Sequence, residues 1–178
     1  MNISIKELEP DYLQEWFHTE GSFVVTSKLV LSVNGRQISY TVQEVPAYQK
    51  CYTDEQVDYS SYINNPDQII YVAFCGDQAV GHILVKRNWN RYACVEEIKV
   101  DQTARRTGVG RMLMDRAKKW AHEGGMPGIM LETQNNNVAA CRFYERCGFV
   151  LGGFDFQVYQ GIDSQTDEIA LYWYWRGA

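Results

Sequence analysis

The sequence has few of the residues that form metal sites and disulfide frameworks. Among 178 residues there are three histidines and five cysteines, and no C-x-x-C pair occurs. The histidines, at positions 18, 82 and 122, are far apart in the sequence, whereas a zinc site needs clustered ligands. We therefore expect no metal, and the odd number of cysteines favours free thiols in a reducing cytoplasm.

Long apolar runs and an excess of basic residues are also missing. No run has the roughly 20 apolar residues of a membrane helix. Lys6, Glu7 and Glu9 interrupt the first segment, so we expect neither a membrane partner nor a signal peptide. Lys and Arg number 17 against 22 Asp and Glu, a formal net charge of −5. This balance disfavours nucleic acid as a partner and is compatible with a cationic substrate.

Length, apolar periodicity and turn residues predict one α+β domain over residues 1–178. The turns Asn34-Gly35 and Gly76-Asp77 indicate two hairpins, and we interpret residues 47–68 as a loop with one short helix. Strand-like runs are residues 2–8, 23–33, 36–45, 69–75, 79–87, 92–100, 128–134, 149–159 and 168–175. Helices are expected at 108–123 and 137–148, with a short one that begins at Pro10 and has Leu13, Trp16 and Phe17 as its apolar positions.

A turn rich in glycine and arginine, RRTGVG at residues 105–110, lies between a predicted strand and a predicted helix. The N-terminus of a helix presents free backbone N–H groups and partial positive charge to an anion. Gly108 and Gly110 allow a ligand to approach the backbone closely, and Arg105, Arg106 and Arg111 add positive charge. The turn matches neither a P-loop nor a dinucleotide fingerprint. It predicts a site for a pyrophosphate or similar anion, although an ordinary tight turn with solvated arginines has the same pattern.

A second pattern, NNNVAACRFYERCGF, follows at residues 135–149. Asn137 stands where a helix N-cap is expected, and Ala139 and Ala140 keep the helix slim. Tyr144 lies on the same helix. Its hydroxyl, with an ordinary pKa of about 10, can protonate a thiolate whose thiol has a pKa of about 8.5. A tyrosine at such a position can equally serve packing alone.

Together and in this order, the two patterns resemble the Gcn5-related N-acetyltransferase (GNAT) superfamily. The turn matches its Q/R-x-x-G-x-G/A motif, and the downstream motif N-x-x-A-x-x-F-Y-x-x-x-G-F is present as Asn137, Ala140, Phe143, Tyr144, Gly148 and Phe149. The resemblance covers about residues 68–176. It implies an α+β fold with a central mixed, mostly antiparallel sheet that has a parallel, splayed strand pair and is flanked by helices. It also implies acetyl-CoA as co-substrate, bound by Ile98, Lys99, Val100, Arg105, Arg106, Thr107, Gly108, Val109, Gly110, Arg111, Asn137, Ala140 and Tyr144.

The resemblance further implies catalytic roles. Tyr144 would be the general acid toward the CoA thiolate, and the backbone at Ile98 and Val100 would hold the pantetheine and polarise the thioester carbonyl. An amine with a pKa near 10.4 is protonated at pH 7, so a base must take its proton. Glu96 and Glu97 are the candidates, and strand alternation sends their side chains in opposite directions. We prefer Glu96, because the similar enzymes usually have a carboxylate there.

A narrower likeness, to streptothricin acetyltransferases, rests mainly on MLETQ at 130–134 and EIALYWYW at 168–175. It implies acetylation of a polycationic antibiotic on its β-lysine moiety, by a cytoplasmic monomer or homodimer. Trp173 and Trp175 alternate with Tyr172 and Tyr174, so that one pair faces the core and the other could face substrate. Carboxylates that could attract a polycation are Asp155, Asp163, Asp167 and Glu168.

Two other readings of the sequence stay open. The same fold could acetylate another amine, such as an aminoglycoside, a polyamine, a protein lysine or a protein N-terminus. Alternatively, the chain could be a non-catalytic acyl-CoA sensor that has kept the turn and lost the chemistry. The presence of both Glu96 and Tyr144 disfavours the sensor.

Overall fold

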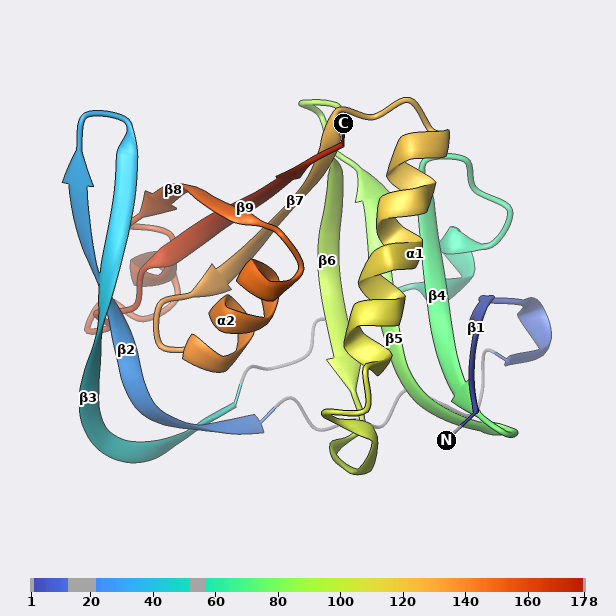
Figure 1. Ribbon diagram of the computed structural model, residues 1–178, viewed down its shortest axis with the longest axis horizontal. Helices are drawn as coiled ribbons and strands as arrows, with labels where there is room; N and C mark the ends of the chain where they lie inside the picture. Colours follow the sequence, from blue (N-terminus) through green and yellow to red (C-terminus); the bar gives the residue numbers. More distant parts are fainter. Residues whose placement is uncertain (1, 13–21, 52–56, 178) are drawn as a thin grey trace. The chain divides into compact units, whose positions relative to one another are not determined.

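The structure is a computed structural model that describes residues 2–12, 22–51 and 57–177 (Figure 1). The chain forms two compact units. The first contains residues 1–21, 53–129 and 177–178, and the second contains residues 22–52 and 130–176. The single domain expected over residues 1–178, with a cofactor-binding core at about 68–176, stays a prediction.

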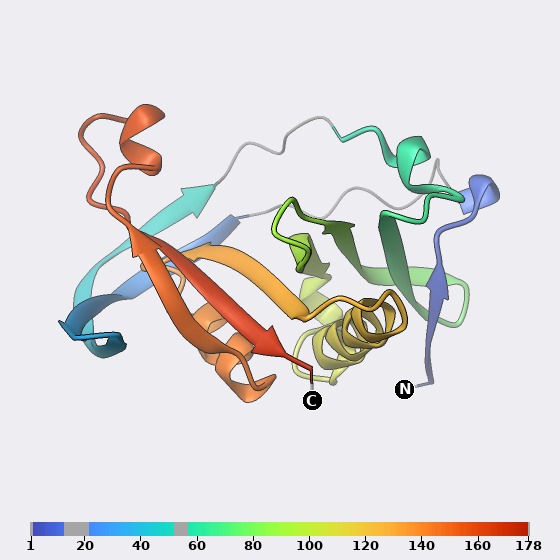
Figure 2. The ribbon, with the colours of Figure 1, turned by 90° about the horizontal axis from the view of Figure 1, so that it is seen from above.

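The first unit contains four strands in the order β1-β4-β5-β6, each antiparallel to its neighbour. Their bounds are Ile3–Glu7, Gln68–Cys75, Gln78–Arg87 and Ala93–Val100. Helix α1 (Val109–Glu123) covers one side of these strands, and the 3₁₀ turn η2 (Tyr59–Tyr62) lies on the other side (Figure 2). The antiparallel pairing of β4 with β5 confirms the predicted hairpin at Gly76-Asp77. Helix α1 confirms the predicted helix after residue 108.

Strand alternation divides the side chains of β4 and β5 between these two sides. Ile70 and Leu84 face each other across the strand pair and belong to a buried cluster with Tyr62 of η2. On the opposite side, the guanidinium of Arg116 from α1 lies 5.1 Å from the centroid of the Tyr71 ring. Because both sides of the strands are covered, the inner residues of β4 are all buried, and its apolar side chains do not alternate with polar ones.

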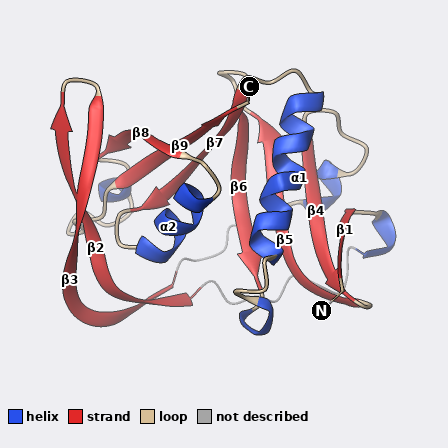
Figure 3. Cartoon of the chain, viewed as in Figure 1, coloured by secondary structure: helices blue, strands red, loops and turns tan. Residues whose placement is uncertain are grey.

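The second unit combines a long antiparallel hairpin, β2 (Ser22–Asn34) and β3 (Gln37–Cys51), with three strands in the order β7-β9-β8 (Figure 3). These strands are β7 (Gly128–Gln134), of which residues 130–134 belong to this unit, β8 (Val150–Asp155) and β9 (Ala170–Arg176). Helix α2 (Val138–Arg146) follows β7, and the 3₁₀ turn η4 (Tyr159–Gly161) follows β8.

Three predicted boundaries in the second unit differ from the structure. The first hairpin is confirmed, but its two turn residues are Gly35, with φ +60°, and Arg36. Strand β3 continues past the predicted end at residue 45, because Pro46 lies at an irregularity where the pairing with β2 shifts. Strand β8 ends at Asp155, whose carboxylate accepts hydrogen bonds from the backbone of Gln157 and Val158.

Some sequence-based expectations concern the chain outside these elements. The short helix expected after Pro10 is seen as the 3₁₀ turn η1 (Pro10–Tyr12), and Leu13, Trp16 and Phe17 lie outside the described residues. The five cysteines are free thiols in the structure. No helix in the described part of the chain is long and apolar enough to cross a membrane. Within the same residues, no three His, Cys, Asp or Glu side chains form a group that could hold a metal ion.

Candidate active site

The turn at residues 105–110 presents an open helix N-terminus. Gly108 is the N-cap of α1, in the left-handed region with φ +94° and ψ −5°, and no side chain caps the helix there. The first four N–H groups of a helix have no partner within the helix. A Cβ atom at Gly108 would meet no atom of the described residues within 4 Å. The backbone N–H groups at the start of α1 are therefore open to a ligand.

Interactions within the first unit fix the path of this turn. Asp101 N donates to the carbonyl of Val80 at 2.8 Å, and Thr107 Oγ1 donates to the carbonyl of Ala104 at 2.6 Å. Arg105 folds back, with its Nε 3.1 Å from the carbonyl oxygen of Val100. Of the predicted arginines, Arg106 is an exposed residue with φ +64°. The turn thus combines a fixed backbone with accessible positive charge.

A β-bulge sets the directions of the two candidate bases. Glu97 pairs with Leu84 and Val95 pairs with Val85, which leaves Glu96 as the extra residue of β6. The hydroxyl of Tyr62 donates to Oε2 of Glu96 at 2.9 Å, and Oε1 of Glu96 forms an ion pair with Lys86. Glu96 therefore points to the side of the strands where η2 lies.

Glu97 lies on that same side. Its Oε1 is 2.5 Å from Nε2 of His82, a side chain that follows the alternation of Leu84 along β5, and its Oε2 is 2.9 Å from Nζ of Lys99. The expectation that the two glutamates point in opposite directions is therefore wrong, because the bulge adds one residue to the alternation. Burial raises the pKa of Glu97, but the hydrogen bonds from His82 and Lys99 outweigh it, so the pKa lies below its ordinary value.

The second predicted pattern builds the start of helix α2. Asn137 is the N-cap, and its Oδ1 accepts a hydrogen bond of 3.2 Å from the backbone N–H of Ala140. Tyr144 is 7% exposed, and its ring centroid lies 6.1 Å from that of Phe149 and 6.5 Å from that of Trp173. Among the described residues, the Tyr144 hydroxyl forms no hydrogen bond. Burial raises the pKa of Tyr144, with the neighbouring thiols Cys141 and Cys147 adding to the effect, so the phenol stays protonated at neutral pH.

Asn135 is a structural residue that the sequence analysis did not single out. Its backbone N–H donates to the carbonyl of Ile169 at 3.0 Å, and its side chain accepts from the N–H of Ile169 and donates to the carbonyl of Leu29. It thereby joins β2 to the segments before α2 and β9. The run of three asparagines before the helix is the only sequence signal for it.

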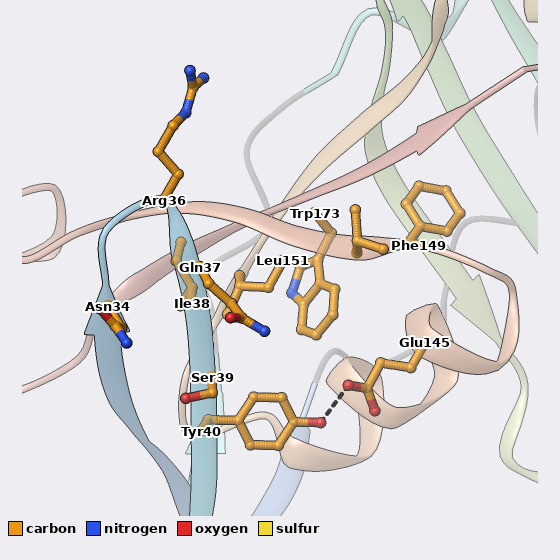
Figure 4. Close-up of a pocket in the computed structure, with 11 residues that line it drawn as sticks. Asn34, Arg36, Gln37, Ile38, Ser39, Tyr40, Glu145, Phe149, Leu151 and Trp173 are labelled. Carbon is orange, nitrogen blue, oxygen red and sulfur yellow. Dashed lines mark hydrogen bonds between the residues drawn. The ribbon is translucent and has the colours of Figure 1, made fainter.

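The second unit also contains a cavity of about 860 Å³ that none of the predicted site residues lines. It lies between the tip of the β2–β3 hairpin and the end of α2, where the hydroxyl of Tyr40 donates to Oε1 of Glu145 at 2.5 Å (Figure 4). The Trp173 side chain on its wall is 1% exposed, and its indole Nε1 has no hydrogen-bond partner in the part of the chain that the structure describes. No pattern in the sequence indicates this cavity.

The carboxylates expected to attract a cation differ in whether a neighbouring lysine neutralises them. Asp167 forms an ion pair of 2.7 Å with Lys28, and Glu168 forms one with Lys50. Oδ1 of Asp163 accepts the N–H of Gln165 at 3.0 Å within a turn. Two of these carboxylates are therefore neutralised within the unit.

The first unit thus brings together two groups of predicted residues. Glu96 and Glu97 lie on β6 with the backbone positions Ile98, Lys99 and Val100, and the turn at residues 105–110 follows the 3₁₀ turn η3 (Gln102–Ala104). The second unit brings together Asn137, Ala140 and Tyr144 on α2. The roles assigned to these residues stay predictions.

Comparisons with known proteins point to one family. The family model described as the acetyltransferase (GNAT) family matches residues 38–149. The chain is 36% identical to a streptothricin acetyltransferase of Escherichia coli, over 93% of this chain and 92% of that protein. It is 33% identical to streptothricin acetyltransferase A of Bacillus subtilis strain 168, over 86% of this chain and 88% of that protein.

A solved structure is similar over the whole length. It is that of a Bacillus anthracis str. Ames protein assigned as a streptothricin acetyltransferase, in complex with acetyl coenzyme A. It has 51% sequence identity and a TM-score of 0.93, over 100% of this chain and 99% of that one. The likeness confirms the predicted fold class, a mixed α+β sheet of the GNAT type.

Proposed function

Because the chain belongs to the acetyltransferase (GNAT) family, we propose that it transfers the acetyl group of acetyl-CoA to the β-lysine moiety of streptothricin and so gives resistance to this antibiotic. Family membership confirms the predicted enzyme class, an acetyl-CoA-dependent acetyltransferase. The observation that carries the substrate is the similarity, over nearly the whole chain, to proteins named as streptothricin acetyltransferases.

The turn at residues 105–110 is the proposed site for the pyrophosphate of acetyl-CoA. Among residues 2–12, 22–51 and 57–177, no side chain caps the N-terminus of α1, and no atom lies within 4 Å of a Cβ built at Gly108. Backbone N–H groups and the helix dipole favour an anion at this position, and the exposed Arg106 and Arg111 add positive charge. On α2, we assign the pantetheine contact to Asn137 and Ala140.

Glu96 is the proposed proton acceptor. The amine nitrogen attacks the thioester carbonyl carbon, the C–S bond breaks, and the proton of the amine passes to Glu96 directly or through water. Glu97 suits this role less, because the hydrogen bonds with His82 and Lys99 hold its pKa below the ordinary value and make it a weaker base. The bulge supports the choice of Glu96, because it turns this residue out of the regular strand pairing.

Tyr144 is the proposed general acid toward the leaving thiolate. Its buried phenol is protonated at neutral pH, and its hydroxyl has no hydrogen-bond partner among the described residues. The proton is therefore available to a departing sulfur, and the C–S bond can break without leaving a free thiolate. The ring contacts with Phe149 and Trp173 hold the side chain in place.

The net charge of the chain supports the proposed substrate, and the co-substrate supports the proposed place of action. Streptothricin is a polycation, and the chain has a formal net charge of −5, so long-range attraction speeds their encounter. We propose the cytoplasm as the place of the reaction, and acetyl-CoA as co-substrate supports this location.

An acetyl-transfer assay with three amines tests the proposal. The purified chain, acetyl-CoA and either streptothricin, an aminoglycoside or a lysine peptide are mixed, and CoA release is followed with the Glu96→Gln variant as control. We expect rapid release with streptothricin and slow release with the other two. Faster release with another amine would contradict the substrate, and no release with any amine would favour an acyl-CoA sensor.

A further inference from the structure

The two sequence segments that carry the narrower likeness meet in space at Glu132. This residue lies on β7, and the hydroxyl of Tyr159 on η4 donates to its Oε1 at 2.7 Å. Tyr172 on β9 lies near Glu132, and burial together with the negative charge of this carboxylate raises the pKa of the Tyr172 hydroxyl. A carboxylate from MLETQ and a phenol from EIALYWYW are thus direct neighbours within the second unit.

Strand alternation places this group on the side of the strands away from α2. In β7, Leu131 and Thr133 are buried, whereas Glu132 between them is exposed. In β9, Trp173 is buried and contacts Tyr144 of α2, so Tyr172 points away from that helix. Of the two aromatic pairs predicted to alternate in β9, the tyrosines are therefore the pair that can face a ligand.

The charge of this group is not balanced by a neighbouring cation. In the same unit, Lys28 neutralises Asp167 and Lys50 neutralises Glu168. Among the described residues, no Lys, Arg or His side chain forms an ion pair with Glu132 or with the nearby Asp155. Burial raises the pKa of Tyr172, and the negative charges of Glu132 and Asp155 raise it further. The local potential is therefore negative.

A carboxylate beside aromatic rings is suited to an ammonium group. The carboxylate attracts the positive charge, and the ring faces add a cation–π attraction of about 0.5–1 kcal/mol at exposed sites. The Tyr159 hydroxyl fixes the carboxylate, so little side-chain freedom is lost when a ligand binds. Tyr159 is 9% exposed, so the surrounding residues hold its side chain, and its hydroxyl, in place.

We infer that Glu132, held by Tyr159 and flanked by Tyr172, binds a cationic group of the substrate other than the amine that is acetylated. The inference rests on the proposed function, since streptothricin supplies more than one cationic group. An ion pair with a carboxylate stabilises the protonated form of an amine, whereas the amine that attacks the thioester must be neutral. Glu132 therefore serves recognition of the substrate, while the proton acceptor is a different residue.

The test compares the kinetics of streptothricin acetylation in three proteins at saturating acetyl-CoA. Glu132→Gln removes the charge and keeps the shape, and Tyr159→Phe removes one hydrogen bond to Glu132. Glu9→Gln is the matched control, because it makes the same change of charge at an exposed residue of the first unit. Melting temperatures show whether each variant is folded.

We expect Glu132→Gln to raise the KM for streptothricin about tenfold, with kcat and the KM for acetyl-CoA nearly unchanged. Tyr159→Phe should raise the same KM less, and Glu9→Gln should leave it unchanged. A folded Glu132→Gln variant with the wild-type KM for streptothricin would contradict the binding site and leave the proposed function intact. An equal rise of this KM in Glu9→Gln would do the same. A wild-type protein that does not acetylate streptothricin would contradict the proposed function, and the inference with it.

Discussion

The hydroxyl of Tyr62 lies 2.9 Å from Oε2 of Glu96 and donates a hydrogen bond to it. Lys86 forms an ion pair with the other carboxylate oxygen, so both oxygens of the Glu96 carboxylate are held. Glu96 is also the bulged residue of β6. The carboxylate is thereby fixed in one direction, as a proton acceptor must be.

The variant Glu96→Gln should lower kcat by about 10², because it removes the proton acceptor. The loss should be largest at low pH, where more of the amine is protonated. Tyr62→Phe keeps the ring and releases one end of the carboxylate, so a smaller loss is expected. Rates measured from pH 6 to 9, roughly the range in which amine protonation begins to change, check this. A loss in Glu97→Gln as large as that in Glu96→Gln would contradict the assignment.

The variant Gly108→Val should weaken CoA binding at least tenfold, about 1.4 kcal/mol. The new side chain would occupy the open space beside the helix N-terminus, where no protein atom lies within 4 Å of the Cβ position. Gly76→Val is a matched control, because Gly76 has φ +62°, equally open surroundings and a place in a distant hairpin turn. Both variants carry comparable backbone strain. Calorimetry that finds equal CoA affinity in the two folded variants would refute the pyrophosphate site.

The variant Tyr144→Phe should lower kcat by about 10² or more and leave the KM for acetyl-CoA nearly unchanged. Its melting temperature should match that of the wild type, because the hydroxyl forms no hydrogen bond among the described residues. Tyr71→Phe, at an equally buried tyrosine beside α1, should keep full activity. Wild-type turnover in Tyr144→Phe would leave this residue with a packing role only.

The Glu97 carboxylate should make stability depend on acid. Because its pKa is below the ordinary 4.5 in the folded protein, its contribution is complete above that pH and is lost as the pH falls through the folded-state value. Glu97→Gln should therefore lower the free energy of unfolding at pH 7 by about 1 kcal/mol and by less at pH 3. Urea unfolding at both pH values measures the difference. The same loss at both would show that His82 and Lys99 do not act through the charge of Glu97.

Most of the fold could be predicted because its signals are local. The hairpin at residues 68–87 and the start of α1 depend on turn glycines and on apolar spacing within a few residues. The bulge at Glu96 has no such signal, since neither glycine nor proline marks it. Its position depends on pairing with β5, which a single strand does not reveal.

The Glu132 group was missed for a similar reason. Its members lie at positions 132, 159 and 172, and only the order of β7, β9 and β8 in the second unit brings them together. The same holds for Asn135, whose partners are Leu29 and Ile169. Contacts between distant segments depend on strand order, and strand order is the part of a fold that periodicity does not determine.

The most direct test of the central claim is growth of a streptothricin-sensitive bacterium that expresses this chain, on plates that contain the antibiotic. We predict growth with the wild-type chain and none with Tyr144→Phe at equal protein level. The purified wild-type protein should transfer acetyl from acetyl-CoA to streptothricin in parallel. Cells that stay sensitive, while the purified protein acetylates some other amine, would contradict streptothricin as the substrate.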